Sequence, residues 1–155
     1  MVNIEPRIEM LNNHTDPVTK QMLQSVVDKK RKLENFENYA NQFRVYTFAC
    51  LALFLIYLTL FIIQPNISSI GSIISLFLDN IFHLIVILLI TTGYATVRYF
   101  DKKADKADDE FHALRCEIIS KSTDLWPRPT SWSEREQVFE IMKHEYDINL
   151  YTENK

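Results

Sequence analysis

The residues best suited to chemistry in this sequence are Asp79 and His83, which lie four positions apart beside a long apolar run. On one helix this spacing places both side chains on the same face. An ionisable pair at membrane depth is costly and often marks an ion, proton or metal pathway. Asp79 falls at the outer end of the run, so the simpler interpretation is an interfacial anchor or a helix-capping role.

Other residues give little indication of catalysis. Cys50 and Cys116 are far apart and belong to no Cys/His cluster, so neither a zinc site nor a disulfide framework is predicted. The sequence contains no Walker loop, Rossmann glycine motif, HExxH or GxSxG. We therefore predict no catalytic residue, no cofactor and no metal site, and the chain is interpreted as not being an enzyme.

The charges are unevenly distributed along the chain. The 155 residues include 17 basic and 20 acidic side chains and have a mean hydropathy of −0.10, which resembles a soluble domain. Residues 45–97, however, contain one charged residue, Asp79. The chain is thus an apolar block between two polar arms, and its net charge of −3 gives no general attraction to nucleic acid.

Two uncharged segments, 45–63 and 81–97, are long enough to cross a bilayer. At about 1.5 Å per residue, the first spans roughly 28 Å of a hydrocarbon core of about 30 Å. The alternative is a pair of buried core helices, but the rest of the chain is too short to wrap two helices that are apolar all round. We therefore predict two transmembrane helices.

The placement of Lys and Arg predicts the orientation. The connector 64–80 contains neither residue, whereas basic residues flank the other ends of both spans, so both termini are expected in the cytoplasm. No signal peptide is expected, because the first 20 residues hold no apolar run. Within the connector, apolar residues at three- and four-residue spacing predict a helix lying in the outer interface or extending the second span.

The two arms carry heptad spacing typical of coiled coils. After an N-terminal tail (1–16), residues 17–44 are predicted to form a cytoplasmic amphipathic helix that starts at Asp16-Pro17, and residues 98–126 a second helix. The seams could pair within one chain as an antiparallel stalk, or between copies. The predicted seam residues are Met22, Val26, Leu33, Phe36, Ala40, Phe43, Phe100, Ala104, Ala107, Phe111, Leu114 and Ile118.

Small residues on the second span predict close helix packing. Thr92, Gly93 and Thr96 would let this helix approach either the first span or another copy of itself. The basic run 29–32 could touch anionic lipids, but its distance from the span favours a solvated helix face.

The C-terminal segment 127–155 is predicted to form a turn, a short helix and a tail. Capping-box spacing occurs at Ser133 with Glu136 and, in an alternative register, at Ser131 with Glu134. Residues 148–151 form either a short strand or an extended tail. We expect the aromatic and aliphatic residues of this region to fold back on the stalk; an exposed partner-binding hook is the alternative.

The segments FHALRCEIISKSTDLWPRP (111–129) and WSEREQVFEIMKHEYDINLY (132–151) follow two spans, and DPVTKQMLQSVVDKK (16–30) precedes them. This combination resembles the YpbF-type family of small membrane proteins of Bacillus-like bacteria. The resemblance implies a Gram-positive plasma membrane protein without an assigned activity. The layout also resembles, in architecture only, the two-span SLATT-type effector domains, which are thought to form pores.

The sequence therefore predicts an all-α membrane protein. Its two transmembrane helices form a hairpin that extends into a cytoplasmic antiparallel helical stalk, followed by a short C-terminal helix. The function we favour is non-catalytic: helix–helix assembly as a scaffold, regulator or docking partner, in a homo-oligomer or with a cytoplasmic protein. The alternative is an oligomeric pore or ion-conducting effector.

Overall fold

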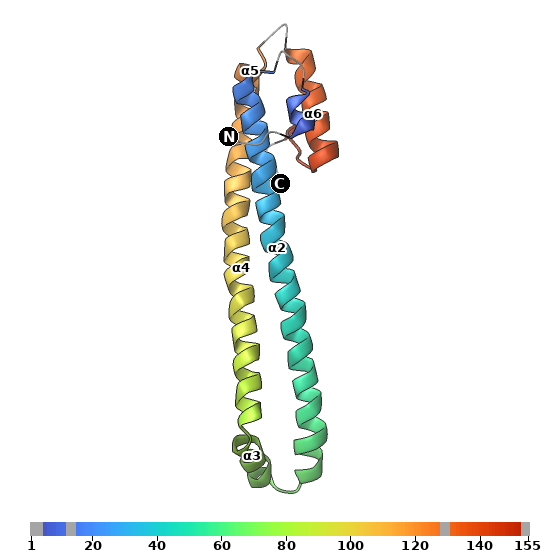
Figure 1. The fold of residues 1–155 in the computed structure, drawn as a ribbon, viewed down its shortest axis with the longest axis vertical. Coiled ribbons are helices and arrows are strands. Elements are labelled where there is room, and N and C mark those ends of the chain that lie inside the picture. Colours follow the sequence, from blue (N-terminus) through green and yellow to red (C-terminus); the bar gives the residue numbers. More distant parts are fainter. Residues whose placement is uncertain (1–4, 12–14, 128–130, 153–155) are drawn as a thin grey trace. The chain divides into compact units, whose positions relative to one another are not determined.

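The computed structural model describes residues 5–11, 15–127 and 131–152, apart from the side chain of Ser133. Within these ranges every regular element is helical and no strand occurs, so the prediction of an all-helical chain is confirmed (Figure 1). Residues 148–151 form an extended tail. The α-helices are α1 (Pro6–Glu9), α2 (Pro17–Leu58), α3 (Ile70–Asp79), α4 (Ile81–Ser120), α5 (Ser122–Leu125) and α6 (Trp132–Tyr146).

The chain divides into two compact units. One, here called the terminal unit, comprises Met1–Glu34 and Ala104–Lys155, and the other, the central unit, comprises Asn35–Lys103. Helices α2 and α4 contribute a segment to each unit.

The first apolar segment ends near Pro65, but through a change of helix type. After Leu58 the chain continues as a π-helical turn, Thr59–Ile63, and then a 3₁₀ turn, Gln64–Asn66. Pro65 has no N–H to donate, which favours departure from α-helical geometry there. The side-chain amide of Asn66 donates to the Ile62 carbonyl at 3.0 Å and so satisfies one acceptor that the ending helix leaves free.

The connector forms a separate helix, α3, and does not extend α4. Ser69 caps its N-terminus by accepting a hydrogen bond from the Ser72 amide. Asn80 then adopts an extended conformation, and its side-chain oxygen accepts from the Phe82 amide at 3.0 Å, at the start of α4. Asp79 and His83 therefore belong to different helices, and the prediction that they share one helix face is wrong.

The C-terminal elements differ in detail from the predicted ones. Helix α4 ends at Ser120 and does not reach 126; Ser120, Ser122 and Thr123 follow closely on one another here, and Ser and Thr disfavour a helix interior. Helix α6 has Ser131 as its N-cap residue, without a side-chain cap; a cap by Ser133 lies outside the described side chains. The helix ends at Asp147, whose φ of 54° is left-handed, and the Ile148 amide donates to the Met142 carbonyl.

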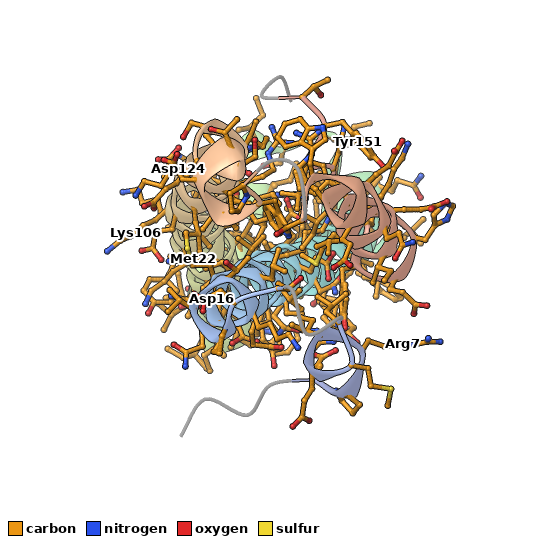
Figure 2. The ribbon with its side chains drawn as sticks, turned by 90° about the horizontal axis from the view of Figure 1, so that it is seen from above. Arg7, Asp16, Met22, Lys106, Asp124 and Tyr151 are labelled. Atoms are coloured by element: carbon orange, nitrogen blue, oxygen red, sulfur yellow. The ribbon has the colours of Figure 1, made fainter. Side chains whose placement is uncertain are left out.

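The terminal unit has a conventional apolar core. Its fully buried side chains come from several helices and from the tail after α6, and the Trp126 ring meets that of Phe139 edge-on at 5.7 Å. The charged side chain of Lys106 points away from the helices (Figure 2), and Arg7 Nη2 lies 3.5 Å from Oε1 of Glu145 on α6. The tail thus folds back and does not form an exposed hook. The core includes Ile8, Leu23, Ile118, Trp126, Met142, Ile148 and Leu150, each with 0% of its surface exposed.

Candidate functional site

His83 joins three helical segments of the central unit. Its ring is 1% exposed, and Nδ1 lies 2.8 Å from the Phe77 carbonyl oxygen of α3. Because a carbonyl can only accept, Nδ1 is the donor, and in the neutral ring Nε2 accepts from the hydroxyl of Tyr57 on α2 at 3.3 Å. The ring also stacks on Phe77, with centroids 5.1 Å apart.

This arrangement is suited to holding helices together. The Phe77 carbonyl belongs to the last turn of α3 and lacks an intrahelical partner, so His83 caps it. Asp79 is exposed and accepts a hydrogen bond from Ser75 at 3.1 Å. The structure therefore does not bring Asp79 and His83 together, and both nitrogens of His83 are engaged by protein groups.

Gly93 of α4 lies directly against Thr47 of α2. A Cβ atom built at Gly93 would lie 2.6 Å from Oγ1 of Thr47, well inside van der Waals contact. That hydroxyl donates to the Phe43 carbonyl at 2.7 Å. The other two predicted packing residues lie less deeply: Thr92 is exposed and Thr96 half-buried, and each bonds a carbonyl of its own helix.

The predicted seam residues divide by burial. Phe43 is 39% exposed, and Met22, Phe36, Phe100 and Leu114 are half-buried. The Phe100 ring lies near those of Phe36, Phe43 and Tyr39, at centroid distances of 6.5, 5.8 and 5.5 Å. The heptad spacing did not single out Tyr39 or the fully buried Leu23. The buried seam residues are Val26, Leu33, Ala40, Ala104, Ala107, Phe111 and Ile118.

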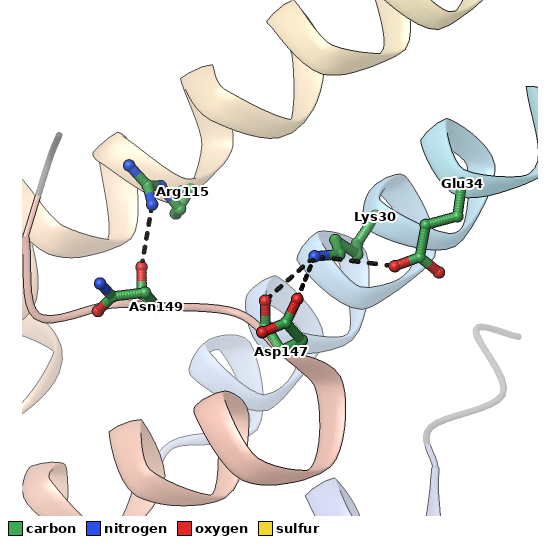
Figure 3. A network of polar contacts seen from close by, with 5 residues as sticks. All are labelled: Lys30, Glu34, Arg115, Asp147 and Asn149. Carbon is green, nitrogen blue, oxygen red and sulfur yellow. Dashed lines mark hydrogen bonds and ion pairs between the residues drawn. The ribbon is translucent and has the colours of Figure 1, made fainter. Parts of the chain in front are cut away.

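The basic run 29–32 forms ion pairs in the terminal unit. Arg31 and Lys32 are exposed, as predicted for a solvated face, whereas Lys29 and Lys30 are half-buried. Lys30 Nζ lies 3.2 Å from an Asp147 carboxylate oxygen and 3.1 Å from its backbone carbonyl, and 3.7 Å from Glu34 (Figure 3). Arg115 donates to the Asn149 carbonyl at 3.3 Å. These contacts fix the chain that leaves α6. Lys29 and Lys32 both contact Glu110, at 3.0 and 3.9 Å.

A second polar group attaches the N-terminal segment to the terminal unit. The Tyr146 hydroxyl donates to the Glu5 carboxylate at 2.9 Å, and Arg31 forms an ion pair with the same carboxylate. Partial burial raises the pKa of Glu5, but these two donors outweigh it and hold the pKa below its ordinary value. Burial, the hydrogen bond to Glu5 and its negative charge raise the pKa of Tyr146 to about 12.

Sequence reasoning missed this attachment, because residues 1–16 were predicted to be a tail. Helix α1 has four residues, too few for a periodic signal. Its Ile8 is nevertheless completely buried, and the Glu5 amide donates to the side chain of Gln24 at 3.0 Å. The signal available in the sequence was the pair of apolar residues Ile8 and Leu11, which indicates that this segment packs against other parts of the chain.

Comparison with known proteins identifies the family. Residues 22–153 match the family described as a protein of unknown function, DUF2663. The chain belongs to this family. It is 43% identical over 145 residues to the "Uncharacterized protein YpbF" of Bacillus subtilis (strain 168), covering 94% of this chain and 95% of that protein. The YpbF-type resemblance is confirmed, and no solved structure matches.

Proposed function

We propose that the central unit crosses the plasma membrane as a two-helix hairpin and that the terminal unit is its cytoplasmic domain. The observation that carries this proposal is the exposure of apolar side chains. In the most apolar 18-residue windows of Pro17–Asn66 and Ile81–Ser120, only 6% and 11% of the residues are buried. Bulky residues such as Phe48, Phe61 and Leu88 are more than 60% exposed.

This exposure separates the membrane interpretation from that of a soluble core. Transferring apolar surface from water is favourable by about 25 cal/mol per Å², so a water-soluble chain would bury these side chains. The terminal unit buries many of its apolar side chains completely, among them Ile118, Trp126 and Met142, although Met10 and Val18 are exposed. The central unit leaves its apolar side chains available for lipid, as expected of helices in a bilayer.

The charge distribution supports the orientation. No Lys or Arg occurs between residues 64 and 80, whereas Arg44 precedes the first apolar segment and Arg98, Lys102 and Lys103 follow the second. Short loops rich in Lys and Arg stay on the cytoplasmic side. In the proposed topology, α3 lies on the outer side and both termini are cytoplasmic.

The proposed role is non-catalytic assembly, as a scaffold, regulator or docking partner for further copies or for a cytoplasmic protein. Two cavities of the terminal unit have volumes of about 200 and 140 Å³, below the ~300–1,000 Å³ of typical small-molecule sites. The networks around Lys30 and Glu5 hold this unit together from distant parts of the chain. These observations favour recognition through its surface.

Three measurements test the proposal. Alkaline carbonate should leave the protein in the membrane fraction, whereas release into the supernatant would contradict the hairpin. The Leu53→Arg variant should insert into the membrane less well, since arginine at a span centre costs about 2.5–3.5 kcal/mol. Asn41→Arg, outside the span, is the matched control.

The oligomeric state in mild detergent separates assembly from pore formation. A monomer, a dimer or a defined complex with a cytoplasmic protein supports assembly, and a ring of four or more copies would favour a pore.

A further inference from the structure

A groove of about 470 Å³ lies between α2 and α4 in the central unit. This volume is within the range of ligand sites, ~300–1,000 Å³. Charged residues line one end of the groove, and apolar residues continue away from it along both helices. The non-charged lining comprises Thr47, Phe48, Leu51, Ile90, Tyr94 and Val97.

The charged end carries a positive charge that is not paired. Arg44 and Asp101 form an ion pair at 2.9 Å, while Arg98 has no carboxylate partner among the described residues. Together these three side chains give a net charge of +1 at neutral pH. Tyr94 lies four residues before Arg98, on the same helix face, and is 61% exposed. This end therefore offers a cation and a hydroxyl to an anionic group.

We propose that the groove binds one anionic phospholipid of the cytoplasmic leaflet. The phosphate lies at Arg98 and Tyr94, and one acyl chain follows the wall formed by Phe48 and Ile90. The inference rests on the proposed membrane hairpin, in which Arg98 lies at the cytoplasmic boundary. From Ile90 to Arg98 the helix rises about 12 Å, so the groove holds the part of an acyl chain nearest the headgroup.

The net charge of the charged end of the groove favours anionic over zwitterionic lipids. A zwitterionic headgroup carries its own cation, which a site of net charge +1 disfavours, whereas an anionic headgroup leaves one negative charge to pair with Arg98. A basic residue near the membrane surface contributes about 1 kcal/mol to binding anionic lipid, which corresponds to about fivefold in affinity. The alternative occupant, a second copy of the chain packed symmetrically, would bring two unpaired Arg98 side chains together.

Native mass spectrometry of the full chain, released from nanodiscs of equal parts phosphatidylglycerol and phosphatidylcholine, tests the proposal. We expect the wild type to retain one phosphatidylglycerol per chain in preference to phosphatidylcholine. Arg98→Gln should reduce this retention about fivefold, and Arg98→Lys should preserve most of it. The matched control is Lys102→Gln, which removes the same charge from an exposed residue outside the groove and should reduce retention less than Arg98→Gln does.

A separate variant tests the contact between the acyl chain and the apolar part of the groove. Ile90→Trp would fill the groove while leaving Arg98 intact, and it should also lower phosphatidylglycerol retention. Equal losses in Arg98→Gln and Lys102→Gln, or a dimer that carries no lipid, would overturn the proposal. Release of the wild type by carbonate would instead contradict the membrane hairpin itself, so the two failures are distinguishable.

Discussion

Replacing Gly93 by alanine is expected to weaken the packing of α4 against α2 in the central unit. The added Cβ would lie 2.6 Å from Oγ1 of Thr47, whereas ordinary van der Waals contact starts at 3.4 Å. The two groups must therefore separate by about 0.8 Å. Thr47 can rotate and lose its 2.7 Å hydrogen bond to the Phe43 carbonyl, or the helices can move apart.

The magnitude follows from two opposing effects. Overpacking of this kind costs about 1–3 kcal/mol, while alanine gains up to about 1 kcal/mol over glycine in helix propensity. Gly93→Ala should therefore destabilise the helix pair by up to about 2 kcal/mol. With Thr47→Ala the obstructing oxygen is absent, and the remaining contact of 3.5 Å to the Thr47 Cβ is ordinary. In that background Gly93→Ala should stabilise by up to about 1 kcal/mol.

Fluorescence resonance energy transfer between two dyes measures the stability of the helix pair in the wild type, in Gly93→Ala, in Thr47→Ala and in the double variant. Dyes on Asn41→Cys and Lys102→Cys, both exposed, report helix separation during a titration with sodium dodecyl sulfate, with the native cysteines replaced by serine. Gly71→Ala is the matched control, because no atom lies within 4 Å of its added Cβ. Gly71→Ala should be neutral or slightly stabilising in both backgrounds. If Gly93→Ala has the same effect with and without Thr47→Ala, the proposed steric contact is refuted.

Four further predictions concern the contacts of His83, Glu5, Tyr146 and Trp126. Tyr57→Phe should lower helix-pair stability by about 0.6 kcal/mol and His83→Leu by more, since His83→Leu also removes the α3 cap; equal effects would contradict the two-bond arrangement. Because the pKa of Glu5 is lowered, its stabilisation of the terminal unit is present above the unfolded value of 4.5 and lost as pH falls through and below it. The pKa of Tyr146 is raised to about 12, so stability should also fall between pH 10 and about 12. Tyr146→Phe should abolish this alkaline loss in thermal unfolding, and an unchanged loss would exclude Tyr146 as its cause. Trp126→Ala should cost about 3–5 kcal/mol in chemical denaturation of the terminal unit, because the ring is fully buried; a cost below about 1 kcal/mol would show that the ring is not a core residue.

Features that depend on nearby residues could be predicted from the sequence. The start of α2 at Pro17 was predicted from Asp16-Pro17, and the connector was predicted to contain a helix, which the structure has as α3. Each feature depends on the local chemistry of a few side chains. The close approach at Gly93 was also indicated, because a helix position without a side chain permits near contact.

Features that depend on distant partners could not be predicted in this way. The basic run lies on an amphipathic helix, and no residue near it indicates the partner of Lys30. That partner is Asp147, which lies more than a hundred positions away in the sequence. The short α1 is fixed by contacts with α2 and α6. At Asp79 and His83, spacing alone suggested a shared face, but Asn80 separates the two helices with its side chain.

Cysteine accessibility in intact cells is the most direct test of the membrane hairpin. In a chain with Cys50 and Cys116 replaced by serine, Ser72→Cys places a thiol on α3 and Ser120→Cys places one at the end of α4, both at exposed positions. A membrane-impermeant maleimide should label Ser72→Cys before lysis and Ser120→Cys only after lysis. Labelling of Ser72→Cys only after lysis, or of Ser120→Cys from outside, would contradict the proposed topology.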